Sequence, residues 1–287
     1  MVRILGTIFA GLLGLAFGSF LNVCLSRWPE GKSVVRPRSR CRACGRTLTW
    51  WENVPVVSWL ALRGRCRTCG AWIGVRYVVV ELAVGGLWAV QAWRFFEAVY
   101  WQDNYFDVAL ASAVSKALFD WLLVALAVLD AENFWLPDWL TLPGIVLGFL
   151  LTTFLSPLDP SWWLRGETIQ HAAFVDALAV MLAFVLILVI RWVYWLVRRK
   201  EGMGLGDAKL MAMLAAWLGL PGALLALFIG VLMGAVAAVG VLVVPKGDGE
   251  AWGARRLPLG TFLCVGGIVT SLWGEKIIDV YLKWAGF

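Results

Sequence analysis

Residues 172–197 read AAFVDALAVMLAFVLILVIRWVYWLV, and this run holds only two charged side chains, Asp176 and Arg191. A helix that crosses a bilayer needs about 20 consecutive, mostly apolar residues, so the run is long enough to span. The whole chain of 287 residues is 61% hydrophobic and 15% charged, whereas soluble domains are about half apolar and about a quarter charged. Composition therefore predicts an all-α polytopic membrane protein.

Outward from this run, further apolar segments predict about eight transmembrane helices. Their approximate cores are residues 4–25, 77–93, 108–129, 139–155, 172–197, 210–220, 223–244 and 259–272. The division between the sixth and seventh cores rests on the turn sequence GLPG at residues 219–222.

Loop charge sets the expected orientation. Between Arg27 and Arg76 the chain carries eleven Lys or Arg residues against two acids. A DNA-binding surface could have this charge, but basic loops beside membrane spans are typical of the cytoplasmic side, so we favour that interpretation and expect no nucleic-acid partner. Alternation along the chain then places the N-terminus outside and residues 130–138, 198–209 and 246–256 in the cytoplasm.

The basic stretch contains two Cys-x-x-Cys pairs. Their cysteines are Cys41, Cys44, Cys66 and Cys69. Two such knuckles can present four thiolates to one ion, which is the ligand set of a structural zinc site. Two disulfides are the alternative, but thiols in a cytoplasmic loop stay reduced. We therefore expect a small zinc-ribbon-like insert between the first two helices, because about fifty residues are too few for a large core of their own.

Two aspartates are predicted to lie at the same face of the membrane, each at the end of an apolar span. Residues 204–207 read Gly-Leu-Gly-Asp, and an earlier apolar run closes at Asp130. Carboxylates at membrane depth are costly, so each is a candidate functional residue. Each also has a structural alternative, because Asp207 could cap the following helix and Asp130 could be a solvated residue at a helix end. Glu81, just inside the second helix, is a further candidate.

Two neighbouring carboxylates can share one proton. The ionised one can take a proton from water and the protonated one can donate to a peptide carbonyl, which is the chemistry of an aspartyl protease. The sequence has no Gly-x-Ser-x-Gly and no His-Glu-x-x-His motif, and its one histidine is His171. A proton-coupled transporter is the competing class, but it would distribute its carboxylates across the bilayer.

The ordered motifs resemble the type IV prepilin peptidase family of membrane aspartyl proteases, over most of the chain. The resemblance rests on Gly18-Ser19-Phe20-Leu21-Asn22-Val23, both cysteine pairs, Trp51-Glu52-Asn53-Val54-Pro55, Arg63-Gly64, Arg76-Tyr77 with Glu81, Asp130, Pro137-Asp138, Gly204-Leu205-Gly206-Asp207-x-Lys209-Leu210 and Pro258-Leu259-Gly260. One departure is Leu259 and Thr261, where relatives commonly carry Phe and Pro.

The resemblance implies an enzyme that cuts a short basic leader from type IV prepilins and type II secretion pseudopilins, after a glycine, at the cytoplasmic face of the bacterial inner membrane. It also implies methylation of the new N-terminal amine with S-adenosylmethionine; a leader peptidase without methyltransferase activity is the alternative. By resemblance, Asp130 and Asp207 are the catalytic pair. Support of the catalytic loop is expected from Gly204, Gly206, Lys209 and Asp138, and a methyltransferase site from Glu81, Asn22 and Arg63.

We therefore expect four parts along the chain. They are a first transmembrane helix at residues 1–26, a cytoplasmic cysteine module at 27–76, a second helix with an external loop at 77–107, and a six-helix protease domain at 108–287. The cysteine module would form the methyltransferase region together with the first two helices. The expected partners are prepilins, pseudopilins and membrane lipid.

Overall fold

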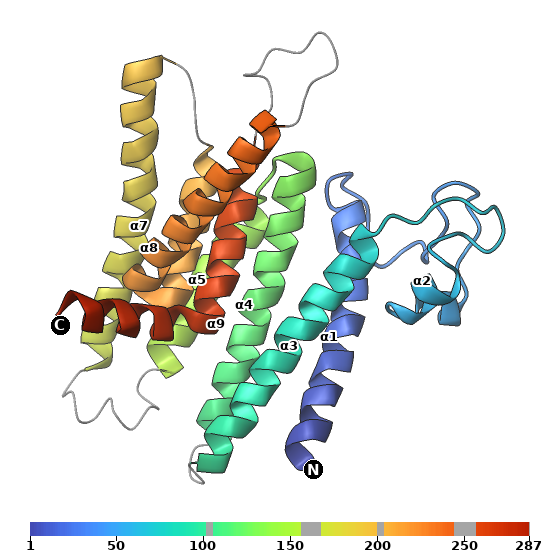
Figure 1. Ribbon diagram of the computed structural model, residues 1–287, viewed down its shortest axis with the longest axis horizontal. Helices are drawn as coiled ribbons and strands as arrows, with labels where there is room; N and C mark the ends of the chain where they lie inside the picture. Colours follow the sequence, from blue (N-terminus) through green and yellow to red (C-terminus); the bar gives the residue numbers. More distant parts are fainter. Residues whose placement is uncertain (102–105, 156–167, 200–203, 244–256, 287) are drawn as a thin grey trace. The chain divides into compact units, whose positions relative to one another are not determined.

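The computed structural model describes residues 1–101, 106–155, 168–199, 204–243 and 257–286, and these are mainly helical (Figure 1). The long helices are α1 (Val2–Arg27), α3 (Arg76–Trp101), α4 (Phe106–Asn133), α5 (Asp138–Leu155), α7 (Ile169–Arg198), α8 (Leu205–Val243) and α9 (Leu259–Ala285). Two short elements, η1 (Trp50–Asn53) and α2 (Val57–Ala61), lie between α1 and α3. The described residues contain no strand beyond isolated bridges, so the expected all-α fold is confirmed.

Seven helices of the described ranges are long and apolar enough to cross a membrane. Their outer surfaces are apolar as well. For example, α7 exposes Phe174, Met181 and Val189. Water-facing surfaces do not gather large apolar side chains in this way, whereas lipid-facing surfaces do.

The chain divides into two compact units, Met1–Ala125 and Leu126–Phe287. In the first unit, α1 and α3 pack side by side. Their backbones approach closely at Gly18, where a Cβ atom would lie 2.7 Å from Glu81 Cα. Small residues at such contacts are typical of helices packed in lipid. The first part of α4 joins this unit through Asp120, which accepts a hydrogen bond from Gln91 of α3 at 2.7 Å.

In the second unit, α8 is interrupted at Gly219, whose φ of 68° and ψ of 175° are not helical. The positive φ is a conformation that glycine adopts without steric cost. The arm before Gly219 packs against α5. The arm after it runs antiparallel to α9, because Gly230 lies against Leu263 and Gly266 lies against Ala226.

The two arms of α8 run in opposite directions. A Cβ atom on Gly206, at the start of α8, would lie 3.1 Å from Leu136 Cβ, and one on Gly260, at the start of α9, would lie 3.0 Å from Leu136 Cδ1. Both helices therefore begin at the same end of the second unit. An arm that is antiparallel to α9 must return to that end, as the ribbon shows (Figure 1).

Seven helices of the described residues are long and apolar enough to cross a membrane, whereas the sequence predicted about eight. The reversal in α8 explains the difference. The cores expected at residues 210–220 and 223–244 are the two arms of α8, so seven helices with one folded in two give the expected eight segments. The first arm lies in the core of its unit, with Leu210, Met211, Met213 and Leu214 fully buried. Burial on all sides fixes the position of this arm, and with it the Gly204–Asp207 segment at its start.

Candidate active site and metal centre

Asp130 and Asp207 come together in the second unit. Asp130 lies in the last turn of α4 and Asp207 in the first turn of α8, and the two residues are only 6% and 9% exposed. Leu136 packs against Gly206, which precedes Asp207, and against Gly260 at the start of α9. Gly260 also adjoins the Asp130 carboxylate, since a Cβ atom there would lie 2.9 Å from Asp130 Oδ2. The structure places both aspartates at helix ends of the second unit, and their role as a catalytic pair stays a prediction.

Thr261 holds the Asp130 carboxylate. Its backbone N–H donates to Asp130 Oδ2 at 2.7 Å, and its hydroxyl lies 3.1 Å from the same oxygen. The hydroxyl also lies 3.0 Å from the Ala127 carbonyl oxygen. On the other side, a Cβ atom on Gly260 would be 2.9 Å from Asp130 Oδ2, so only glycine leaves room for the carboxylate there.

Asp207 is not the N-cap residue that the structural alternative named, because α8 starts at Leu205 and Asp207 is its third residue. Its Oδ2 accepts a hydrogen bond from the backbone N–H of Gly204 at 3.2 Å, across the first turn of α8. This is the reciprocal half of a capping box. The bond occupies one carboxylate oxygen, so capping the helix leaves the other oxygen for chemistry.

The two residues expected to support the catalytic loop form an ion pair. Lys209 Nζ lies 2.6 Å from Asp138 Oδ1, although the Asp138 side chain is 60% exposed. The pair joins the start of α8 to the start of α5. Its exposure limits its energy to about 1 kcal/mol or less, so it fixes geometry more than stability.

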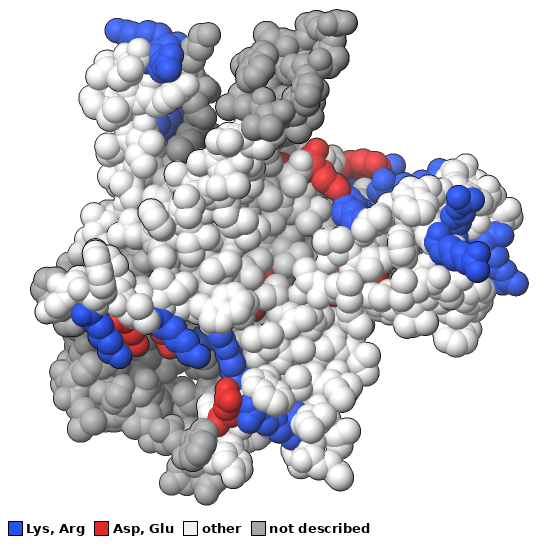
Figure 2. Space-filling model, viewed as in Figure 1, with Lys and Arg blue, Asp and Glu red and all other residues white. Residues whose placement is uncertain are grey.

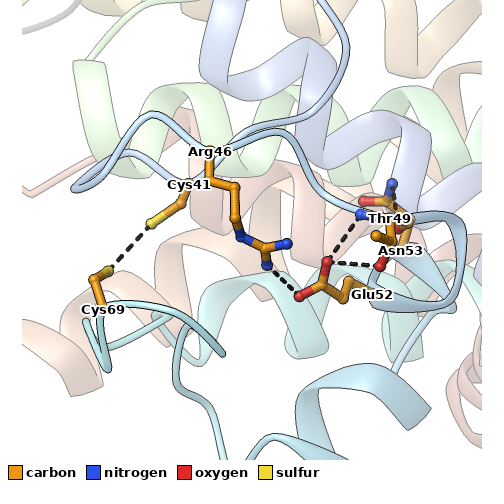
Figure 3. A network of polar contacts seen from close by, with 6 residues as sticks. All are labelled: Cys41, Arg46, Thr49, Glu52, Asn53 and Cys69. Carbon is orange, nitrogen blue, oxygen red and sulfur yellow. Dashed lines mark hydrogen bonds and ion pairs between the residues drawn. The ribbon is translucent and has the colours of Figure 1, made fainter.

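The four knuckle cysteines of the first unit form one cluster. Their sulfur atoms all lie within 4.8 Å of one another, and all four are free thiols. Figure 3 shows Cys41 and Cys69, one from each knuckle, facing each other with their sulfurs 3.8 Å apart. Gly45 and Gly70 close the knuckles at φ values of 72° and 67°. Sets of four thiols at this separation can hold a metal ion, so the expected metal site is confirmed at that level and the disulfide alternative is not realised.

Polar contacts hold the module together beside the cluster. Glu52 accepts from Thr49 N–H at 2.8 Å and from the Thr49 hydroxyl at 2.7 Å, and it pairs with Arg46 (Figure 3). Hydrogen bonds from Arg46 and Thr49 lower the pKa of Glu52 to about 2. Backbone N–H groups of Cys69 and Thr68 lower the pKa of Cys66 to about 6, which favours the thiolate at this position, whereas the pKa of Cys69 is raised.

Two of the three residues expected for methyl transfer lie on facing helices. Glu81 accepts a hydrogen bond from Val56 N–H at 2.7 Å and is 7% exposed. Asn22 is 2% exposed, and its Nδ2 donates to the Tyr77 carbonyl at 2.9 Å. Its buried Oδ1 has no hydrogen-bond partner among the described residues. Arg63 instead lies exposed on the module at a φ of 51°.

Sequence reasoning missed two contacts of these sites. Thr261 entered only as a departure from the family pattern, and a proline at its position would offer neither of the two donors that reach Asp130. Val56 was not singled out, because no sequence pattern announces its φ of 60° or its bond to Glu81. Both contacts join residues that are far apart in the chain.

The fold and site define a class: polytopic helical membrane proteins that combine paired carboxylates at helix ends with a four-cysteine cluster. A family model described as "Bacterial Peptidase A24 N-terminal domain" matches residues 12–95, and one described as "Type IV leader peptidase family" matches residues 117–239. No solved structure matches the chain.

Curated relatives match nearly the whole length. The prepilin leader peptidase/N-methyltransferase of Stutzerimonas stutzeri is 34% identical over 299 residues, covering 96% of this chain and 93% of the relative. The protein of the same name from Pseudomonas aeruginosa is 35% identical over 301 residues, with the same coverage. That of Myxococcus xanthus is 40% identical over 238 residues, covering 83% of this chain and 63% of the relative. The chain belongs to the prepilin leader peptidase/N-methyltransferase family of multi-pass membrane proteins.

Proposed function

We propose that this chain is a prepilin leader peptidase that also methylates the amine it exposes. The observation that carries this proposal is the placement of two buried carboxylates, Asp130 and Asp207, at neighbouring helix ends around Leu136. The names of the relatives support the same two activities. The substrates would be type IV prepilins and type II secretion pseudopilins with short basic leaders, cut after a glycine at the cytoplasmic face of the inner membrane. The loop charges support this face.

Thr261 distinguishes the two carboxylates. Its backbone N–H donates to one oxygen of Asp130, and its hydroxyl is shared between that oxygen and the Ala127 carbonyl. Hydrogen bonds to a carboxylate favour its ionised form. Asp207 receives a single, longer bond of 3.2 Å from Gly204. We therefore assign Asp130 as the base and Asp207 as the acid that starts protonated.

Peptide cleavage then proceeds with a water molecule between the pair. Asp130 takes a proton from the water while the water oxygen attacks the scissile carbonyl carbon. Asp207 gives its proton to the carbonyl oxygen. The neutral diol collapses when Asp207 takes back a hydroxyl proton and the C–N bond breaks. The proton held by Asp130 passes to the leaving amine, so both carboxylates return to their starting states.

The second activity would use residues of the first unit. S-adenosylmethionine, when bound, supplies an electrophilic methyl group. Asn22 and Glu81 offer buried acceptor oxygens that fit an amino group, and Arg63 offers an exposed guanidinium that fits a carboxylate. We propose these three as methyltransferase residues. The amine that is methylated must be neutral, and with a pKa of about 8 only a minor fraction is neutral at neutral pH.

The four-cysteine cluster would hold zinc. The ligands fit, because four sulfurs within 4.8 Å of one another make the closed thiolate set that zinc favours in structural sites. With no ligand position left for water, the ion would stabilise the module and take no part in either reaction.

Mass spectrometry of a co-expressed prepilin tests both activities. Asp130→Asn and Asp207→Asn are expected to leave the leader uncut. Asp176→Asn is the control, since Asp176 is a half-buried carboxylate of the second unit that accepts a hydrogen bond from the Thr153 hydroxyl at 3.0 Å. Normal processing by either of the first two variants would contradict the assignment.

The same spectra separate cutting from methylation. Glu81→Gln is expected to give a cut but unmethylated N-terminus. A wild-type product that is cut and unmethylated would identify a leader peptidase without methyltransferase activity.

A further inference from the structure

The cysteine module exposes large apolar side chains on one short segment. Trp50 of η1 is 77% exposed, and Val57 and Leu60 of α2 are 62% and 60% exposed. Val57, Leu60 and Ala61 are the exposed residues of α2 and occupy positions i, i+3 and i+4, which is one helix face. We call Trp50, Val57 and Leu60 the apolar face. Single exposed apolar residues are ordinary, but several on one short segment indicate a contact.

The apolar face is fixed alongside a membrane-spanning helix. Val56, the residue before α2, donates its N–H to Glu81 at 2.7 Å. Glu81 lies five residues into α3, and at 1.5 Å per residue this is about 7 Å from the helix start. The neighbouring Val79 and Leu82 of α3 are 57% and 53% exposed, so at this level α3 presents apolar side chains outward.

Val56 has a backbone conformation that keeps the start of α2 beside Glu81 of α3. Its φ of 60° is unfavourable for a β-branched residue, and such strain persists only where surrounding contacts impose it. Here the imposed contact is the bond to Glu81. The start of α2 is therefore held beside the first turns of α3.

The rest of the module surface is strongly basic. Its exposed arginines are Arg36, Arg38, Arg40, Arg42, Arg63, Arg65 and Arg67. Between residues 33 and 75 the sole acid is Glu52, which is buried and paired with Arg46. Figure 2 shows basic side chains gathered over the module. Arginine and tryptophan together are typical of the headgroup region of a membrane, where anionic lipids attract the cations and the indole rings are half solvated.

We propose that the apolar face lies in the headgroup region of the bilayer and that the module arginines bind anionic lipid headgroups. The module is thus an interfacial domain, anchored by α1, by α3 and by its own surface. This inference needs only that α1 and α3 span the membrane. It shares Glu81 and Arg63 with the proposed methyltransferase site but does not depend on that activity. A basic leader peptide is disfavoured as the occupant, because like charges repel.

Photo-crosslinking in lipid tests the proposal on the full-length chain. A benzophenone amino acid is placed singly at Val57 or Leu60, and at Ala43 or Thr68 as matched controls, since both are exposed positions in the cysteine knuckles. Each protein is reconstituted in nanodiscs of mixed zwitterionic and anionic phospholipid, and metal content confirms that the module is folded. We expect the highest yield of phospholipid adducts at 57 and 60 and a lower yield at the controls, which adjoin Arg42 and Arg67.

A second experiment separates the contribution of the anionic headgroups from that of the apolar contact with lipid. Nanodiscs of phosphatidylcholine alone are expected to lower adduct formation at Leu60 at least fivefold, which is about the contribution of one arginine at an anionic surface. An unchanged yield would overturn the headgroup part of the proposal. Absence of lipid adducts at both 57 and 60, or adducts with a co-reconstituted prepilin in place of lipid, would overturn the whole.

Discussion

Replacing Thr261 by valine removes one hydroxyl from the site and keeps the shape of the side chain. The backbone N–H, 2.7 Å from Asp130 Oδ2, is retained. The lost hydroxyl lies 3.1 Å from that oxygen and 3.0 Å from the Ala127 carbonyl, and its one proton serves one acceptor at a time. A full hydrogen bond to a charged group contributes about 1.5–3 kcal/mol, so a shared one should contribute about 1 kcal/mol.

If Thr261 orients the catalytic base, this loss appears in the transition state, and kcat/KM for leader cleavage should fall about fivefold. Single-turnover cleavage of a purified prepilin in nanodiscs measures the rate. Thr261→Ser keeps the hydroxyl and is expected to cleave at close to the wild-type rate.

The control is Thr270→Val, the same substitution in the same helix. The Thr270 hydroxyl is buried and has no hydrogen-bond partner among the described residues, so its removal breaks nothing. Equal rates for Thr261→Val and Thr270→Val would refute the reasoning. So would a loss at Thr261 that merely follows a fall in the folded fraction, measured by thermal unfolding.

Three further predictions concern the cluster, the module and the carboxylate site. Cys41→Ser should abolish metal binding, measured by elemental analysis of the purified protein, and lower its thermal stability. The pKa of Glu52 falls from 4.5 to about 2 on folding. This stabilises the wild-type module above about pH 4.5 and is lost as the pH falls towards 2, so in unfolding measured against pH Glu52→Gln should lack this dependence. Gly260→Ala would place a Cβ atom 2.9 Å from Asp130 Oδ2 and should slow cleavage at least tenfold, whereas Gly240→Ala, with open space around it, should not.

Each of these has its own contradicting result. Cys24→Ser is the control for the cluster, because Cys24 lies buried in α1 away from the knuckles; metal retained by Cys41→Ser would exclude that thiol as a ligand. An identical pH profile for Glu52→Gln and wild type would show that the ion pair between Arg46 and Glu52 does not contribute to the stability of the module. Full activity of Gly260→Ala would show that cleavage does not depend on the position of the Asp130 carboxylate beside Gly260.

The sequence predicted those features that depend on local spacing. Two Cys-x-x-Cys pairs specify two knuckles, and the thiols do meet, since each knuckle has few ways to fold. The end positions of Asp130 and Asp207 followed from counting helices and loop charges. The turn at residues 219–222 was recognised because glycine and proline mark chain reversals.

What the sequence could not predict depends on contacts between distant residues. Thr261 reaches Asp130 across 131 positions, and a threonine in a first helical turn has no pattern that announces such a partner. Leu136 lies between the two carboxylate segments, yet in sequence it is one more apolar residue of a loop. The bond from Val56 to Glu81 likewise requires a backbone conformation that only tertiary packing imposes.

The reversal at Gly219 bears on how the protein is made. Its two arms leave only the residues around Gly219 and Pro221 at the far end, so no long polar segment has to cross the bilayer when the pair inserts. The two arms can therefore enter the bilayer together as one hairpin. Because the second arm also lies against α9, a hairpin that failed to turn would leave the Thr261 end of α9 without its support, and correct insertion of this pair is a condition for assembling the Asp130 site.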